Sequence, residues 1–200
     1  MDDLLTACTR DGCPVCRLEH AADLRFLERL FYERVNDYEL RLHLRSSQGF
    51  CIEHAHKAEE QVQGKALGIA ILYEDILRLA LDQLTEQHTL AAPIKKCPAC
   101  TNRDEFTSRV VIELSRMNKH EELEEAFSHS HGLCFKHLRQ VLAHLQNSNR
   151  KSHLLALQIR IMQSLRADLS EFIRKNDYRF MSEESGPEKN SWLRAIKMIR

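Results

Sequence analysis

Four short motifs in the sequence place cysteine and histidine at spacings that suit a metal ion. Two are Cys-x-x-Cys pairs, in CPVC (13–16) and CPAC (97–100), and two are Cys-x-x-His pairs, in GFCIEH (49–54) and GLCFKH (132–137). Residues three apart lie on one face of a helix. Thiolate sulfur and imidazole nitrogen are ligands that Zn²⁺ prefers in proteins. We therefore take eight residues as candidate metal ligands: Cys13, Cys16, Cys51, His54, Cys97, Cys100, Cys134 and His137.

The four motifs belong to a tandem repeat of about 80 residues. GLCFKH follows GFCIEH by 83 positions, and CPAC follows CPVC by 84. Apolar positions outside the motifs match as well, such as Leu40 with Leu123. A complete site needs four ligands, so the repeat predicts that each copy joins its own Cys-x-x-Cys to its own Cys-x-x-His. The first predicted site is Cys13, Cys16, Cys51 and His54, and the second is Cys97, Cys100, Cys134 and His137.

Three sulfurs and one nitrogen make a complete tetrahedral set for zinc. Because a full set leaves no open coordination position, the pattern predicts two structural zinc ions and no metal catalysis. Iron–sulfur clusters are the alternative for the same ligands, since histidine can replace cysteine in some of them. A thioredoxin-like dithiol is disfavoured, because that motif belongs with a βαβ pattern, which the sequence lacks.

The chain between the motifs is predicted to be helical throughout, which gives an all-α fold. Strand patterns are nearly absent, and glycine and proline are scarce. A long helix is expected over 65–87 in the first copy and over 150–175 in the second. The helix over 65–87 is apolar nearly all round, so we expect it to be central and buried.

Two further helices are expected to bring the ligands of the first copy together. A helix over 17–35 is followed by a stop at Asn36 and by an N-cap at Asp37 for a shorter helix over 38–46. These helices would form a hairpin that returns Cys51 toward the Cys-x-x-Cys pair of the same copy. A single uninterrupted helix could not return the chain in this way.

The repeat predicts three parts of the chain. Residues 1–90 form the first helical metal-binding repeat, 91–180 the second, and 181–200 a polar linker with a C-terminal amphipathic helix. Docking of that helix on its own domain is favoured over binding a partner helix or an acidic surface. Its apolar face is predicted to carry Trp192, Leu193, Ile196 and Ile199.

The remaining cysteine and several histidines do not follow the repeat. Cys8 corresponds to Ala92 and is expected to be an ordinary free thiol. His131 corresponds to Gln48, and His56 and His129 have no matching histidine either. We expect these histidines to lie at the surface or beside the ligands and not to bind the metal.

The composition argues against several function classes. Lys plus Arg equals Asp plus Glu at 29 each, whereas nucleic-acid-binding domains are usually basic. No signal peptide and no membrane span is recognisable, so we expect a cytoplasmic protein with reduced thiols. No Gly-rich phosphate loop and no nucleophile–base arrangement is found. The sequence thus predicts a non-enzymatic zinc-binding module for a protein partner, or alternatively an iron–sulfur redox or enzyme-accessory protein.

The duplicated CPxC and GxCxxH motifs, together with VNDYE (35–39) and LYEDIL (72–77), resemble a family of small uncharacterised bacterial proteins. The resemblance covers most of residues 10–175. It implies a bacterial, cytosolic protein and brings no established activity.

Overall fold

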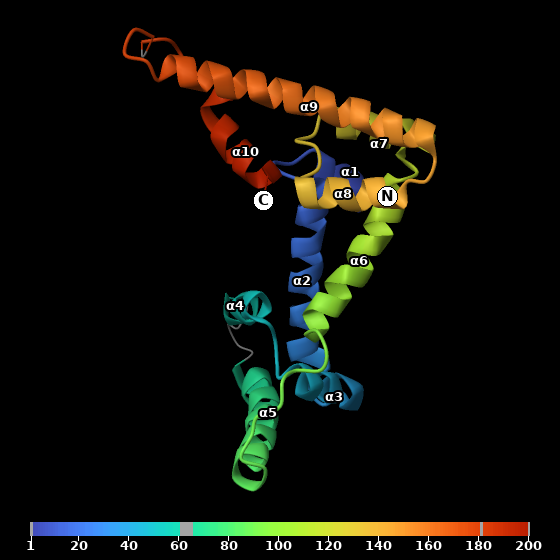
Figure 1. The fold of residues 1–200 in the computed structure, drawn as a ribbon, viewed down its shortest axis with the longest axis vertical. Coiled ribbons are helices and arrows are strands. Elements are labelled where there is room, and N and C mark those ends of the chain that lie inside the picture. Colours follow the sequence, from blue (N-terminus) through green and yellow to red (C-terminus); the bar gives the residue numbers. More distant parts are fainter. Residues whose placement is uncertain (1, 61–65, 181, 200) are drawn as a thin grey trace. The chain divides into compact units, whose positions relative to one another are not determined.

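The computed structural model of the protein describes residues 2–60, 66–180 and 182–199. These residues form helices and no strand, which confirms the predicted all-α fold (Figure 1). The helices are α1 (Asp2–Cys8), α2 (Pro14–Glu33), α3 (Tyr38–Ser47), α4 (Ile52–Glu60), α5 (Ala66–Glu86), α6 (Pro98–Leu114), η1 (Met117–Lys119), α7 (Glu121–Ser128), α8 (Phe135–His144), α9 (Ser148–Lys175), η2 (Pro187–Asn190) and α10 (Ser191–Ile199).

The chain folds into two compact units that divide it differently from the sequence copies. The middle unit is Glu19–Phe106, and the terminal unit combines Met1–Leu18 with Thr107–Arg200. Helix α2 begins in the terminal unit and ends in the middle unit, whereas α6 does the reverse. Each sequence copy therefore contributes residues to both units.

The helix α3 begins where the sequence predicts. The side chain of Asp37 accepts a hydrogen bond from the backbone N–H of Leu40 at 2.8 Å, as expected of an N-cap. Arg34 donates to the same carboxylate and closes the turn between α2 and α3. At the other end, Gln48 has a left-handed backbone with φ of 53°, and Gly49 follows with φ of 94°. Gly49 tolerates this conformation because it has no Cβ.

The core of the middle unit forms where α2, α3 and α5 meet, beside the start of α6. Leu27 and Leu30 of α2, Leu44 of α3 and Leu72 of α5 are each at most 2% exposed. Phe31 adds an edge-on ring contact to Phe50, with centroids 6.0 Å apart. This packing fixes the loop that leads to Cys51, because Phe50 directly precedes that residue in sequence.

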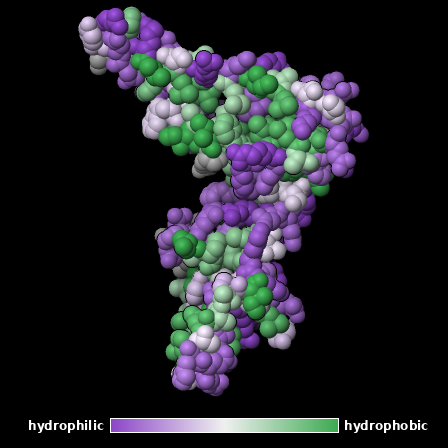
Figure 2. All heavy atoms as spheres, in the orientation of Figure 1, coloured by the Kyte–Doolittle hydropathy of each residue, from purple (hydrophilic) through white to green (hydrophobic). Residues whose placement is uncertain are grey.

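Helix α5 is not buried, which corrects the prediction for 65–87; residue 65 itself lies outside the described residues. Only Leu72 and Asp75 of α5 are buried, and the helix packs on α3. Four leucines on its other side remain exposed, and apolar side chains are visible on the surface over α5 (Figure 2). The periodicity indicated an apolar helix correctly, but the described part of the middle unit places no second layer over it. These leucines are Leu67, Leu77, Leu81 and Leu84.

The terminal unit packs α1 and α9 against α7, and α10 against α8 and α9. Leu4 of α1, Leu123 and Phe127 of α7 and Leu154 of α9 lie in its interior, each at most 2% exposed. The 28-residue helix α9 is capped by Asn147, whose side chain accepts from the N–H of Arg150. This interior encloses the loop that carries Cys134.

The C-terminal helix docks on its own chain, as predicted, but not through the predicted face. Ser191 and Met198 are buried, and Arg194 pairs with Asp168 of α9 at 2.5 Å. The four residues assigned to the apolar face are instead exposed: Trp192, Leu193, Ile196 and Ile199. Pro187 opens η2, the 3₁₀ turn that precedes α10, and residue 181 of the predicted linker lies outside the described residues.

Candidate metal centres

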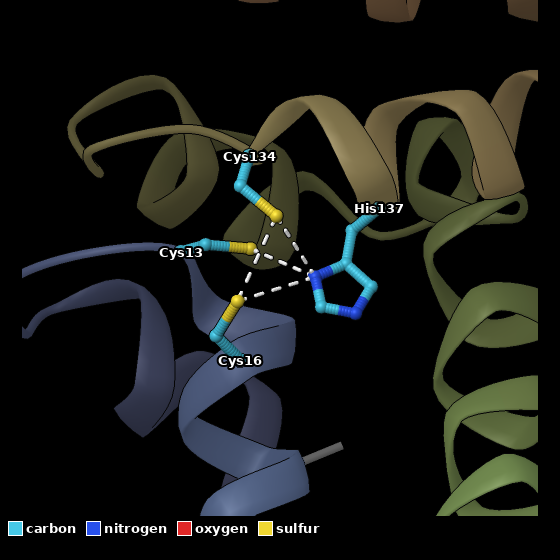
Figure 3. A group of neighbouring side chains, drawn as sticks. All are labelled: Cys13, Cys16, Cys134 and His137. Carbon is cyan, nitrogen blue, oxygen red and sulfur yellow. Dashed lines mark hydrogen bonds between the residues drawn. The ribbon is translucent and has the colours of Figure 1, made fainter. Parts of the chain in front are cut away.

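In the terminal unit, one Cys-x-x-Cys pair and one Cys-x-x-His pair converge around His137 (Figure 3). The Nδ1 atom of His137 lies 3.5 Å from the sulfur of Cys13, 3.3 Å from that of Cys16 and 3.1 Å from that of Cys134. The sulfurs of Cys16 and Cys134 are 3.6 Å apart. All but Cys16 are buried. We call these four residues the terminal cluster.

The middle unit holds a second cluster with the same donor set. The Nδ1 atom of His54 lies 3.2 Å from the sulfur of Cys51, 3.5 Å from that of Cys97 and 3.4 Å from that of Cys100. The sulfur of Cys51 is 3.6 Å from that of Cys100 and 3.8 Å from that of Cys97. Sulfurs at these distances are not disulfide-bonded. We call these four residues the middle cluster.

The clusters contain all eight candidate ligands, but the predicted pairing within each copy is wrong. Each Cys-x-x-Cys pair meets the Cys-x-x-His pair of the other copy. The reason lies in the helix lengths, because the 20 residues of α2 span about 30 Å and the 10 residues of α3 return only about 15 Å. The hairpin therefore leaves Cys51 in the unit that holds the end of α2, and not beside Cys13 at its start.

Each ligand motif sits at the beginning of a helix. Pro14 and Pro98 are the first residues of α2 and α6, so each Cys-x-x-Cys pair spans a helix N-terminus. Cys134 is the N-cap of α8, and Cys51 directly precedes α4. The partial positive charge of a helix N-terminus favours thiolate over thiol. Both clusters therefore gather four donors at two helix starts.

The loop before Cys134 is held by a side chain that the sequence analysis did not single out. Gln158 of α9 accepts a hydrogen bond from the Leu133 N–H at 2.9 Å and donates one to the Leu133 carbonyl at 3.1 Å. A Cβ at Gly132 would lie 2.9 Å from the Gln158 amide, and Gly132 has φ of 68°. The glycine of the motif is thus required both by its backbone conformation and by this close approach. Gln158 is 1% exposed, so its amide is committed to the loop.

The corresponding loop of the middle cluster is held differently. The position that matches Gln158 is Asp75, which is buried and binds Arg45 through two hydrogen bonds of 2.7 Å. Tyr73 instead approaches Gly49, where an added Cβ would meet its ring at 3.4 Å. Arg45 holds the pKa of Asp75 at about 2, against an opposing effect of burial. Two residues at matching positions of the repeat therefore have different roles. Gln158 holds the loop before Cys134 directly, whereas Asp75 binds Arg45 of α3.

Asp23 lies behind His54 and is a functional candidate that the sequence analysis missed. Its carboxylate is fully buried and lies 3.2 Å from His54 Nε2, on the side of the ring away from the sulfurs. Lys57 donates to the same oxygen at 2.7 Å, and Arg103 approaches it at 3.5 Å. Glu53 completes the group through contacts to Lys57 and Arg103. A carboxylate behind a histidine ligand fixes its tautomer and orientation and strengthens its basicity.

No sequence pattern pointed to Asp23, which follows Cys16 by two helical turns on α2 although Cys16 belongs to the other cluster. The repeat does not mark it either, because the position corresponding to Asp23 is Thr107. The neighbours of Asp23 have changed as well. Glu53, Lys57 and Arg103 correspond in the other copy to Lys136, Gln140 and Glu19. The ligands are thus duplicated, whereas the charged residues around them are not.

The crowded thiols cannot all ionise without a cation. In the middle cluster, burial raises the pKa of Cys97, but hydrogen bonds from His54 and the backbone outweigh it and bring it to about 6. Burial and the neighbouring cysteines raise the pKa of Cys100 to about 12. In the terminal cluster, hydrogen bonds from Cys13 and Cys16 lower the pKa of Cys134, while that of Cys13 is raised by those same interactions and by burial. Metal binding would therefore release protons.

The pKa of His54 is raised by the residues around it. Burial lowers the pKa of its imidazole, but hydrogen bonds to Asp23 and to the cysteine sulfurs outweigh this and raise it to about 10. The Nδ1 proton would have to leave before that nitrogen could bind a metal ion, because a ligand nitrogen needs its lone pair. Asp23 would then retain its hydrogen bond to the Nε2 proton.

The residues set aside from the repeat lie outside both clusters. Cys8 is buried in α1, and burial raises its pKa to about 11, as fits an unreactive thiol. His131 accepts a hydrogen bond from the Gly12 N–H at 2.8 Å, so it supports the loop before Cys13. His56 is exposed beside Glu59, and His129 is exposed at the end of α7. None of these residues belongs to the ligand groups found among the described residues.

The fold and the clusters define a small all-α protein with two Cys₃His groups able to hold metal ions. The chain belongs to the Family of unknown function (DUF6062), whose model matches residues 3–95 and 83–200. The two overlapping matches agree with the repeat. The chain is 29% identical over 198 residues to an uncharacterised 23.9 kDa protein in the xynA 3' region of Caldicellulosiruptor sp. (strain Rt8B.4), covering 94% of this chain and 95% of the relative. No solved structure matches this chain significantly.

No helix among the described residues has the length and hydrophobicity of a membrane span.

Proposed function

We propose that the protein is a non-enzymatic zinc protein. In each of its two units, one zinc ion bound by three cysteines and one histidine would stabilise the fold. The donor spacing carries this proposal. With Zn–S bonds of about 2.3 Å and a Zn–N bond of about 2.0 Å, a tetrahedron has S···S edges of about 3.8 Å and S···N edges of about 3.5 Å. Sulfur pairs at 3.6 and 3.8 Å and sulfur–nitrogen pairs at 3.1–3.5 Å fit those edges.

The same spacing disfavours an iron–sulfur cluster. The ligands of such a cluster bind different iron atoms and stand farther apart than ligands of a single ion. Here all four donor atoms of each group lie within 4.8 Å of one another. A single tetrahedral ion fits that space, and a mixed set of three thiolates and one imidazole suits zinc.

A structural role follows from the donor count and from the position of the ligands in the chain. Four protein ligands fill the coordination of zinc and leave no place for water or substrate. In the terminal unit, the ion would join residues 13 and 16 to residues 134 and 137. Such a cross-link opposes separation of two segments that are far apart in sequence, and its binding energy contributes directly to folding.

Metal analysis on protein purified without oxygen tests this proposal. We expect two zinc ions per chain, no labile sulfide and no visible absorption. Replacement by Co²⁺ should give the intense d–d absorption of a tetrahedral thiolate site, since Co²⁺ accepts the same ligands. Iron with labile sulfide would support the redox alternative and overturn the zinc proposal.

We also propose that the exposed face of α5 binds a helix of a protein partner. Residues 67, 70, 74, 77, 81 and 84 alternate in steps of three and four, which is the spacing of a helix-packing seam. Its leucines are 47–75% exposed. Such an exposed apolar stripe is typical of an interaction surface.

The position of Glu74 in that stripe favours a different protein over a second copy. Glu74 is exposed and occupies a seam position between Ala70 and Leu77. In a parallel pair of copies in register the two carboxylates would meet in one layer, and in an antiparallel pair whose stripes overlap fully each would face Leu77. Both arrangements are unfavourable. A partner helix with Lys or Arg opposite Glu74 would satisfy the carboxylate.

A photo-crosslinking residue at position 81, introduced in the native host, tests this surface, with the exposed Gln163 of α9 as the control position. The crosslinked protein should be identified, purified and titrated. We expect Leu81→Asp to weaken the purified complex by roughly tenfold or more, because it places a charge in an apolar contact. Glu74→Lys should weaken it as well. A stable homodimer in sedimentation, or crosslinking equal to that at Gln163, would overturn this part of the proposal.

A further inference from the structure

A hollow in the middle unit is lined by arginines and aromatic rings and lies apart from the metal ligands. It measures about 280 Å³ and is lined by side chains of α2 and α6. Neither a cysteine nor a carboxylate lines it. The residues that matter to its chemistry are Arg25, Phe26, Arg29, Arg34, Asn102 and Phe106.

Two of these arginines lack an acidic partner. Arg25 and Arg29 lie one turn apart on α2, and among the described residues neither pairs with a carboxylate. Two like charges at this spacing disfavour the helix slightly. Arg34 differs, because it binds Asp37 at 2.9 Å. The hollow thus presents two free guanidinium groups beside a third that is already fixed.

The two ends of this hollow differ in charge. A neighbouring hollow shares Phe26, Arg34 and Asn102 and is lined by Glu39 and Glu105. An anion would therefore lie at the end with Arg25 and Arg29, away from those carboxylates. A planar group on the same molecule would lie toward the aromatic rings.

We propose that this hollow binds a small phosphate monoester that carries one planar ring. The guanidinium forks of Arg25 and Arg29 match the oxygens of phosphate and bind them through charge-assisted hydrogen bonds. Phe26 and Phe106 offer apolar ring surface for the planar group. Asn102 can donate to and accept from polar atoms at the ring edge. The small volume favours a single-ring ligand over a larger one.

Isothermal titration of the metal-loaded full chain with inorganic phosphate and with phenyl phosphate tests the proposal at constant ionic strength. We expect both probes to bind and phenyl phosphate to bind more tightly. The double variant Arg25→Gln/Arg29→Gln should weaken both by roughly tenfold or more, because it removes two charged donors. Phe26→Leu should reduce only the advantage of phenyl phosphate.

A matched control removes the same charge elsewhere. Arg160 and Arg166 are exposed on α9 and lie in the terminal unit, so Arg160→Gln/Arg166→Gln should leave both affinities unchanged. Unaltered metal content and melting temperature would show that each variant is folded. The proposal is overturned by absence of saturable binding at millimolar probe, by equal weakening in the control, or by much tighter binding of a single-stranded oligonucleotide or a phosphopeptide. It is independent of the zinc proposal, because its probes do not bind the metal ligands.

Discussion

The middle and terminal clusters have the same four ligand types but different surroundings. In the middle cluster, buried Asp23 lies behind His54 and is itself paired with Lys57. In the terminal cluster, Gln158 secures the loop beside Cys134 through two backbone hydrogen bonds. The positions that match Asp23 and Gln158 in the other copy are Thr107 and Asp75. After the duplication, the ligands stayed alike while the residues that support them diverged, so we expect the two metal ions to differ in affinity.

The largest effect should come from removing one cysteine ligand. We expect Cys134→Ser to abolish one of two zinc ions and to cost several kcal/mol of stability, because structural zinc contributes directly to folding. Hydrogen exchange should increase around Cys13 and Cys16 and much less around Cys97 and Cys100. Cys51→Ser should give the reverse pattern.

Cys8→Ser is the control for these variants, because Cys8 is a buried cysteine outside both clusters. It should retain two zinc ions. Loss of protection around Cys97 in Cys134→Ser would contradict the crossed pairing and restore the pairing within each copy.

Fragments should show the crossed pairing as a difference in metal affinity. A fragment of residues 1–90 contains four ligands, but they belong to two different clusters. A fragment of residues 14–106 contains the whole middle cluster, with α2 to α5 and the first part of α6, residues 98–106. We expect the second fragment to bind one zinc ion at least tenfold more tightly in a competition assay with a chromophoric chelator. Equal affinities would mean that either pairing can form.

Asp23→Asn should affect only the middle ion. We expect its affinity for zinc to fall by about 10–100-fold, since the partner of a histidine ligand typically contributes that much. Competition with a chelator should then release the two ions in separate steps, with the middle ion leaving earlier than in the native protein. The matched variant Thr107→Ala should leave the middle ion unaffected. A single unchanged release step in Asp23→Asn would show that the carboxylate does not support His54.

The sequence predicted which residues cluster better than it predicted their pairing. The repeat identified all eight residues of the two clusters, because a match at 83 or 84 positions repeats both motifs in register. It could not decide which motifs meet, because crossed and uncrossed pairs contain the same residue types. That choice depends on how far the chain turns back after α2, and α3 with the loop after it returns the chain less far than the predicted hairpin required.

The other errors concern what covers a helix. Hydrophobic periodicity identified α5 and α10 as helices with apolar faces, and both helices exist. It could not show that Leu77 and Ile196 remain exposed, because exposure depends on whether another element packs there. Asp23 was missed for a related reason. A lone aspartate on a predicted helix has no pattern that places it against a histidine of a distant motif.

Gln158→Ala should destabilise the terminal unit by about 1–3 kcal/mol, because the N–H and carbonyl of Leu133 would lose their buried partners. Chemical denaturation of the metal-loaded protein would measure this loss. The isosteric variant Gln158→Glu keeps an acceptor for the N–H but places a buried carboxylate against the Leu133 carbonyl, so near neutral pH it should destabilise the unit at least as much as Gln158→Ala. An unchanged midpoint in Gln158→Ala would mean that the zinc ion alone fixes the loop.

Asp75→Asn should have the smallest effect, about 1 kcal/mol, because the amide keeps one hydrogen bond to Arg45 but loses the charge that also attracts Arg41 and Arg78. Arg45 holds the pKa of Asp75 at about 2 in the folded protein, below the value of about 3.9 for a free aspartate. A lowered pKa gives stability that is present above the unfolded value and is lost as the pH falls through the folded value. The difference between the native protein and Asp75→Asn should therefore stay constant between about pH 6 and 8 in denaturation experiments. A difference that changes across that range would show that Asp75 titrates near neutrality and that its contact with Arg45 is weaker than the geometry indicates.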